Sequence, residues 1–191
     1  MSRRPVLHLT TGLPGVGKTT LARRLEREGN ALRLTPDEWM QPLFGDSDAG
    51  GKRDILEGRF IWVAYRALLA GADVVLDFGC WSPEERYAQR AIAALADADF
   101  ELHYLQMPES ERRSRAARRW QITPGETFEM TAADHDRFLA SYQPPTEEEL
   151  AGTTVPDPPS PWSTWTAWAA NRWPTLPDLG HDESAESRQH S

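Results

Sequence analysis

Cysteine and long apolar runs are scarce in this chain of 191 residues, and its 21 basic residues are outnumbered by 29 acidic ones. The single cysteine, Cys80, cannot form an internal disulfide, which fits a reducing compartment. No run of about 18 apolar residues occurs, so the sequence lacks a transmembrane span and predicts a soluble, cytoplasmic protein. The net charge of −8 argues against a broad nucleic-acid-binding surface, because phosphate backbones are bound by clustered Lys and Arg.

The most informative stretch is near the N-terminus, where a short apolar run at 6–11 leads into GLPGVGKTT. This is the Walker A pattern, Gly-x-x-x-x-Gly-Lys-Thr, between a predicted strand and a predicted helix over 19–28. Glycines let the backbone turn its N–H groups toward phosphate oxygens, and the helix N-terminus adds the positive end of its dipole. A turn that carries these residues by accident is rare, roughly under one per cent of chains this size.

Two residues of this motif have specific predicted roles. Lys18 can reach the β- and γ-phosphates, and the hydroxyl of Thr19 is the expected protein ligand of Mg²⁺. We therefore predict binding of Mg-ATP or Mg-GTP by the whole loop: Gly12, Leu13, Pro14, Gly15, Val16, Gly17, Lys18, Thr19 and Thr20.

A carboxylate follows the second predicted strand, at 31–34. Thr35-Pro36-Asp37-Glu38 is a good helix start, with threonine at the N-cap, proline at the first helical position and Glu38 completing a capping box. In that interpretation Asp37 merely complements the helix dipole. Alternatively, Asp37 lies at the carboxyl end of a strand beside the phosphate loop, where it can accept a proton from a substrate hydroxyl. The residues alone leave both interpretations open.

A second carboxylate ends the next predicted strand, DVVLDF at 73–78. In a phosphate-loop protein this is the Walker B arrangement, in which Asp77 holds a Mg²⁺-bound water or polarises the nucleophile. A strand-terminal aspartate that only turns into a loop is the alternative. The preceding Walker A motif favours the functional interpretation.

A basic helix follows a fourth predicted strand at 100–106. Its segment, MPESERRSRAARRW, concentrates five arginines in an acidic chain. They can form a solvated face paired with nearby glutamates. Phosphoryl transfer, however, needs positive charge over the transferring group, and a mobile lid of arginines supplies it while excluding water. We predict a lid over 108–130, with Arg115 and Arg119 as its working members.

Tryptophan recurs every third residue near the C-terminus, at Trp162, Trp165 and Trp168, with Trp173 beyond. Both an aromatic platform for a substrate and an amphipathic helix docked on the core fit this spacing, and the docked helix is the more frequent arrangement. We expect this helix over 162–173, followed by a disordered polar tail over 178–191.

Taken together, these segments resemble the AAA group of P-loop kinases related to polynucleotide 5′-kinase, zeta toxins and chloramphenicol phosphotransferase. The resemblance covers roughly residues 6–150 and rests on GLPGVGKTT, TPDEW…LFG, VVLDFGCWSPEER, the MPESERRSRAARR lid and YQPPTEEE. It implies an ATP-dependent phosphotransferase. It further implies a general base, ligands of Mg-ATP and lid arginines, which match Asp37, Lys18 with Thr19, and Arg115 with Arg119 respectively.

One departure from that group concerns the substrate. Polynucleotide kinases of this type carry an arginine three residues after the catalytic aspartate, where it binds the substrate phosphate, but this chain has Met40 there. This departure argues against nucleic-acid substrates. Neighbouring side chains instead predict an apolar pocket for a small molecule with a hydroxyl, such as an antibiotic, nucleoside or sugar. They are Trp39, Met40, Phe44, Phe78 and Trp81.

We therefore predict one domain over 1–177 with a three-layer α/β P-loop kinase fold, a five-stranded parallel sheet in the order 2-3-1-4-5 and a helical lid. The predicted activity is ATP-dependent phosphorylation of a small-molecule hydroxyl. Its site consists of a base, three cationic groups and two Mg²⁺ ligands: Asp37; Lys18, Arg115 and Arg119; Thr19 and Asp77. Two rivals remain, namely a 5′-hydroxyl nucleic-acid kinase and a non-catalytic ATP-dependent switch that orders a partner-binding surface.

Overall fold

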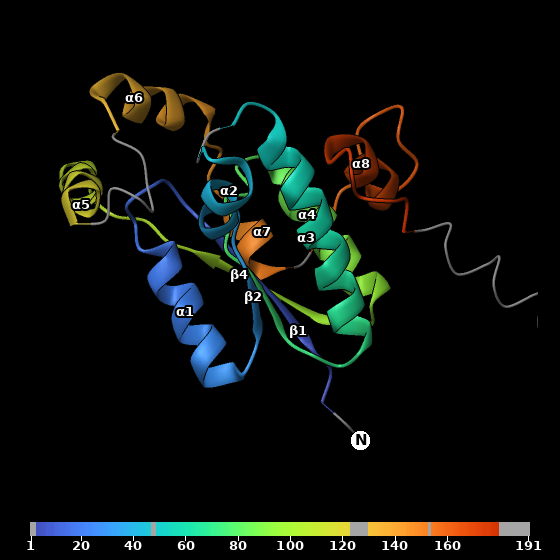
Figure 1. The fold of residues 1–191 in the computed structure, drawn as a ribbon. Helices are drawn as coiled ribbons and strands as arrows, with labels where there is room; N and C mark the ends of the chain where they lie inside the picture. The colour runs from blue at the N-terminus through green and yellow to red at the C-terminus, as the bar shows by residue number, and fades with distance from the viewer. Residues whose placement is uncertain (1–2, 47–48, 123–129, 153, 180–191) are drawn as a thin grey trace, which may run out of the picture.

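The structure, a computed structural model, describes residues 3–46, 49–122, 130–152 and 154–179. Its sheet has four parallel strands in the order β2-β3-β1-β4 (Figure 1). Their bounds are Val6–Thr11 for β1, Leu32–Leu34 for β2, Val74–Leu76 for β3 and Asp99–Tyr104 for β4. This order matches the first four places of the predicted one, and the described residues contain no fifth strand.

The central strands β1 and β3 are apolar where the sheet is covered. Leu7 and Leu9 of β1 are fully buried, as is every residue of β3. Strands of this kind are stable when helices cover the sheet on both faces. The register sets Leu7 beside Val74 and Leu9 beside Leu76. The carboxyl ends of β1 and β3 therefore lie side by side, and the loops that follow them share one edge of the sheet.

Helices cover both faces of the sheet. On one face lies α1 (Lys18–Gly29), and on the other lie α3 (Lys52–Leu69) and α4 (Pro83–Leu95) (Figure 1). The remaining helices are α2 (Pro36–Phe44), α5 (Glu109–Ile122), α6 (Ala132–Ser141), α7 (Glu147–Ala151) and α8 (Trp165–Arg172). Both α5 and α6 lie beyond the carboxyl end of β4 (Figure 1). The predicted three-layer α/β fold is confirmed.

The tryptophan segment is docked on the core. Its helix α8 packs against α4, and Trp165 and Trp173 are buried. Both indoles have hydrogen-bond acceptors: Trp165 Nε1 donates to the carbonyl oxygen of Pro156 at 2.8 Å, and Trp173 Nε1 donates to Glu57 Oε2 at 3.1 Å. Buried indoles with satisfied N–H groups are typical of structural tryptophans. The contacts support the docked helix rather than the substrate platform.

We expect Trp173→Ala to lower the free energy of unfolding by about 3–5 kcal/mol, because it opens a cavity and removes the indole N–H that Oε2 of the buried Glu57 accepts. For a chain of this size the melting temperature should fall by roughly 10 °C. Trp173→Phe should recover more than half of the loss. Thermal and urea melts of Trp39→Ala, where the side chain is 48% exposed, provide the control. Equal losses in Trp173→Ala and Trp39→Ala would contradict a structural role for the docked segment.

Two predicted segments fall partly outside the described residues. Within the lid predicted over 108–130, residues 123–129 are not described. Within the tail predicted over 178–191, only Asp178 and Leu179 are described, and Leu179 is buried. None of the described helices combines the length and apolar character that a membrane span requires.

Candidate active site

The loop between β1 and α1 has the backbone shape that the Walker A pattern predicts. Gly12, Gly15 and Gly17 adopt φ angles of 143°, 90° and 103°, which residues with a side chain rarely adopt. Space is short as well. A Cβ on Gly12 would lie 2.4 Å from the carbonyl oxygen of Leu105, and one on Gly15 would lie 2.6 Å from that of Arg112. The glycines therefore let the loop fold closely against the chain that follows β4.

The loop ends in a set of backbone donors. Gly17 is the N-cap of α1, and no side chain caps the helix there. The amides of the first turn consequently keep their hydrogen-bonding capacity, and the positive end of the helix dipole faces the loop. Such helix N-termini bind phosphate and other anions.

Lys18 folds back over this loop. Its Nζ donates to the carbonyl oxygens of Gly12 at 2.8 Å and Leu13 at 3.1 Å. Desolvation lowers the pKa of Lys18 to about 8, although the negative charges of Asp77 and Asp37 act in the opposite direction. Both carboxylates therefore lie within electrostatic reach of Lys18. A phosphate that enters here would meet a poorly solvated cation.

Asp77 follows β3 and is buried behind the loop. Thr10 Oγ1 donates to its Oδ1 at 3.3 Å, Arg33 Nη1 donates to its Oδ2 at 3.4 Å, and Thr19 supplies a further hydrogen bond. Burial raises the pKa of Asp77, and the charge of Lys18 opposes that rise. The two predicted Mg²⁺ ligands are thus adjacent.

Asp37 lies in the first turn of α2, but the expected capping box does not form. Thr35 is the N-cap, yet its side chain makes no capping hydrogen bond. The carboxylate of Glu38 instead accepts a hydrogen bond from Arg33 at 2.7 Å. Asp37 accepts one from Arg53 Nη1 of α3 at 2.9 Å and stays partly exposed. Ion pairing with arginines has displaced local capping at this turn.

A series of polar contacts connects Asp37 to the tryptophan segment. Arg53 Nε donates to Glu57 Oε1 at 2.9 Å, and Glu57 Oε2 accepts the indole N–H of Trp173. Desolvation raises the pKa of Glu57 to about 7, against the lowering effect of Arg53. Sequence reasoning missed both residues of α3. Their i,i+4 spacing predicts that they pair with each other, but no local signal places Arg53 beside Asp37.

The arginine helix contacts the loop through Arg112, which lies outside the predicted pair of Arg115 and Arg119. Arg112 is buried in the first turn of α5. Its Nη1 lies 3.4 Å from the carbonyl oxygen of Pro14 and 3.0 Å from Nδ1 of His135 in α6. Together with the close approach of its carbonyl oxygen to Gly15, these contacts pack the start of α5 against the loop.

The two arginines predicted to work in the lid lie in different environments. Arg115 is exposed and pairs with Glu111 on its own helix at 2.9 Å. Arg119 is also exposed, but its charge is close enough to contribute to the low pKa of Lys18. Of the two, Arg119 is the one whose charge acts on Lys18, whereas Arg115 is in a surface ion pair.

The predicted apolar pocket is wrong in two of its members. Met40 and Phe78 are fully buried in the core. Met40 is buried where α2 packs against α3, and Phe78 directly follows the buried Asp77. Neither side chain reaches the surface. Trp81 packs edge-on against Phe138, with ring centroids 5.1 Å apart. Of the aromatic residues near Asp37, Trp39 remains exposed.

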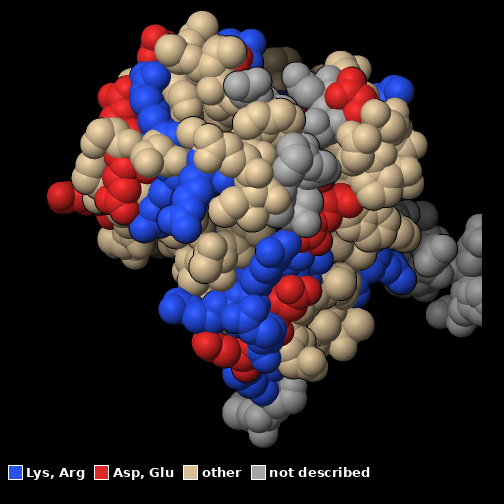
Figure 2. Space-filling view, turned by 60° about the vertical axis from the view of Figure 1, so that its left-hand side comes forward, with Lys and Arg blue, Asp and Glu red and all other residues tan. Residues whose placement is uncertain are grey.

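The surface over α1 and α5 carries mixed charge. Basic side chains gather on this face, but acidic ones are interspersed among them (Figure 2). Arg113 of α5, for example, pairs with both Glu109 and Asp136. Such pairing leaves no unbroken basic field on the face in view, whereas non-specific nucleic-acid binding depends on one.

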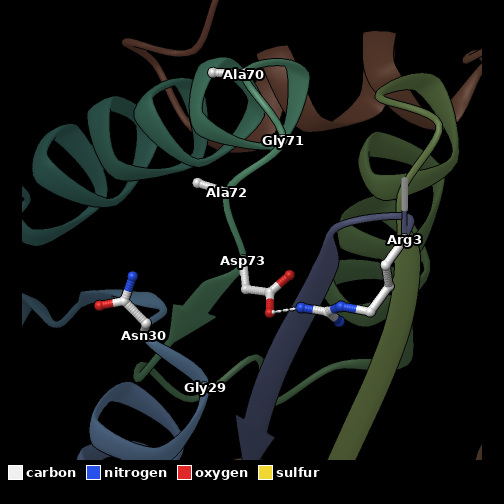
Figure 3. A pocket seen from close by; sticks show the side chains of 7 residues that line it. All are labelled: Arg3, Gly29, Asn30, Ala70, Gly71, Ala72 and Asp73. Atoms are coloured by element: carbon white, nitrogen blue, oxygen red, sulfur yellow. Dashed lines mark hydrogen bonds and ion pairs between the residues drawn. The ribbon is translucent and has the colours of Figure 1, made fainter. Parts of the chain in front are cut away.

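A pocket of about 320 Å³ lies at the opposite edge of the sheet, where α1 ends and β3 begins (Figure 3). Arg3 reaches across to one oxygen of Asp73 (Figure 3). The other oxygen of Asp73 accepts the backbone N–H of Val6 at 2.9 Å. Open α/β sheets bind their ligands at the carboxyl ends of the strands. This pocket is at the amino ends, so we assign it a structural role in joining the N-terminal segment to β3.

The sheet order, the glycine loop and the carboxylates near Lys18 define a P-loop nucleotide-binding protein of the kinase type. The chain belongs to the AAA domain family AAA_33, which matches residues 7–145. No curated protein gives a significant sequence match.

Solved structures of low sequence identity share the fold. The Pnkp1/Rnl/Hen1 RNA repair complex aligns with a TM-score of 0.62 and 19% identity over 81% of this chain and 47% of that one. The Mycobacterium tuberculosis APS kinase CysC, in complex with AMPPNP and APS, aligns with a TM-score of 0.53 and 22% identity. The alignment covers 88% of this chain and 95% of that one. Chaetomium thermophilum Kti12, in complex with ADP-AlF3, aligns with a TM-score of 0.52 and 18% identity. The alignment covers 73% of this chain and 81% of that one. This chain thus spans about half the length of the repair protein, and the likenesses establish the fold.

Proposed function

We propose that this protein is an ATP-dependent phosphotransferase that phosphorylates a hydroxyl group of a small molecule. One observation carries the proposal: Lys18 of the phosphate loop lies within electrostatic reach of two carboxylates in different environments. Asp77 is buried behind the loop, whereas Asp37 is partly exposed on α2. A buried carboxylate suits a metal ion, and an exposed one can contact an acceptor.

The residues present fit Mg-ATP. The loop amides and Lys18 would hold the phosphates, while Thr19 and Asp77 would hold Mg²⁺, which prefers hard oxygen ligands and keeps several waters. Burial disfavours the charged form of Asp77, so a cation nearby would relieve an existing penalty. When bound, Mg²⁺ neutralises negative charge on the phosphates.

The transfer step assigns the remaining groups. Asp37 accepts the proton of the acceptor hydroxyl as the hydroxyl oxygen forms a bond to the γ-phosphorus. The bond between that phosphorus and the β-phosphate oxygen breaks, and ADP leaves. Lys18 and Arg119 stabilise the negative charge on the transferring group. Arg115 joins them when its pair with Glu111 opens and α5 closes over the site.

Arg53 favours an acceptor that carries negative charge near its hydroxyl. Its guanidinium is partly exposed and bound to Asp37, and guanidinium groups bind phosphate in a forked geometry. Arg53 of α3 thus supplies a guanidinium beside Asp37, in a chain that has Met40 in place of the arginine of polynucleotide kinases. A phosphorylated nucleoside or sugar fits this charge. The same observation keeps the 5′-hydroxyl nucleic-acid kinase as a second candidate.

A paired screen tests these proposals. Hydroxyl compounds are incubated with the protein and ATP, each neutral compound beside its monophosphate, and products are read by mass spectrometry. A separate arm offers a 5′-hydroxyl oligonucleotide and follows labelled phosphate. We expect an adduct on a small molecule, with preference for the anionic member of a pair, and we expect Arg53→Gln to lose that preference.

Other outcomes separate the rivals. Label on the oligonucleotide alone supports the second candidate. Adducts that form equally with both members of each pair, in both proteins, contradict the role of Arg53. Nucleotide-dependent association with a protein partner, without phosphorylation of any acceptor, contradicts the phosphotransferase proposal and supports a switch.

A further inference from the structure

Two histidines and a glutamate meet on the sheet face that carries α1. His8 of β1 is in register with Glu101 of β4, and His103 follows two residues later on the same face. His8 is also in register with Val75 of β3, which packs against Ala22 of α1. The cluster is therefore on the face opposite α3 and α4, and β1 and β4 hold it from two adjacent strands.

The three side chains direct one atom each to a common point. His8 Nδ1 lies 3.1 Å from His103 Nε2 and 3.1 Å from Glu101 Oε2, and these last two atoms are 3.6 Å apart. Tetrahedral zinc, with bonds of about 2.0–2.2 Å, holds its ligand atoms roughly 3.3–3.5 Å apart. The observed triangle has nearly the size of one face of that tetrahedron.

Hydrogen bonding alone accounts for this triangle incompletely. Nδ1 of His8 carries at most one proton, which can point directly at only one of its two neighbours at 3.1 Å. A cation at the centre would use a lone pair of all three atoms at once. The imidazoles are also well placed for ligation, because only 12% of the His8 side chain and 22% of the His103 side chain are exposed. Glu101 is more exposed and leaves one side open to water.

We propose that His8, Glu101 and His103 form a binding site for one divalent transition-metal ion of the zinc type, with water in the fourth position. Two imidazoles and a carboxylate match the ligands that zinc prefers, whereas Mg²⁺ prefers oxygen alone. Among the described strands, β4 is at the edge of the sheet. The ion would join this edge strand to β1, which leads directly into the nucleotide loop.

Metal titration of the full chain tests the site. The protein is treated with a chelator, freed of nucleotide and titrated with Zn²⁺ alone by calorimetry, and parallel samples are melted. We expect one ion per chain and, at about a hundred times the Kd, a rise in melting temperature of roughly 5–10 °C. His103→Gln and Glu101→Gln should each raise the Kd by more than about 10-fold, the effect that even an outer partner of a metal ligand has. Mg²⁺ should give no rise.

Matched variants distinguish this site from adventitious binding. His181→Gln combined with His190→Gln removes two other histidines, and Asp99→Asn removes another carboxylate of β4; both should bind Zn²⁺ as the unmodified chain does. The proposal is overturned if the unmodified chain shows no rise, or if the variants of the cluster bind as it does. It is overturned equally if binding is lost only in the variant that lacks His181 and His190.

Discussion

Asp37→Asn is expected to reduce the kcat of phosphoryl transfer by about 10²–10⁴-fold, the usual contribution of a general base, while ATP affinity stays nearly unchanged. Asparagine keeps the size of the side chain and an oxygen that can accept from Arg53, so the change removes the base with little disturbance of α2. Transfer is measured to the acceptor found in the screen, or to water in its absence. The Kd for ATP is measured separately by nucleotide fluorescence.

Glu38→Gln is the matched control for Asp37→Asn. Both acids lie in the first turn of α2, so both complement the helix dipole to a similar extent, worth about 0.3–1 kcal/mol each. Glu38, however, is turned toward Arg23 and Arg33, at 2.8 and 2.7 Å. If Asp37 only supports the helix, the two variants will show the same small loss of stability and no loss of transfer. A parallel loss of transfer and ATP affinity in Asp37→Ala would also argue for a structural role.

The parts of the site that could be predicted from the sequence are those that the local backbone builds. The loop needs positive φ angles at three fixed positions, and the sequence has glycine at each of them. Asp77 was recognised because it ends an apolar strand, and a parallel strand of that kind must end at the same edge as β1. Each of these features depends on a few consecutive residues and one rule of topology.

The parts that could not be predicted depend on contacts between distant elements. Arg53 reaches Asp37 because α3 packs beside α2, and no spacing within either helix reports that contact. The nearness of Met40 to Asp37 in sequence predicts a place on the substrate surface, yet the packing of α2 buries Met40. Arg112 contacts the loop, whereas Arg115 pairs with a glutamate of its own helix. The side of α5 that packs on the loop depends on the direction of the chain between β4 and α5. Helical periodicity gives the faces of α5 but not the face that docks.

Lys18→Ala is expected to weaken ATP binding and to lower kcat by about 10²–10³-fold, because the ammonium acts on both the bound phosphates and the developing charge. The chain's other lysine supplies the control. Lys52 is exposed, with its Nζ 5.1 Å from the ring centroid of Phe44. Lys52→Ala should therefore retain both ATP affinity and transfer rate. A loss confined to kcat in Lys18→Ala would contradict a role of Lys18 in holding the nucleotide.

The low pKa of Lys18 adds a pH dependence that identifies this residue. In the free protein the pKa is about 8 because burial disfavours the ammonium, and a bound triphosphate must raise it, since negative charge favours the protonated form. Above pH 8 the complex thus holds a proton that the free protein has lost, so binding takes up as much as one proton. The affinity for ATP is highest below pH 8 and falls by up to about tenfold per pH unit above it, until the pH reaches the pKa of Lys18 in the complex.

Measuring the Kd for ATP between pH 7 and 9.5 should show this slope in the unmodified chain and in Lys52→Ala but not in Lys18→Ala. The same slope in all three proteins would assign the proton to another group.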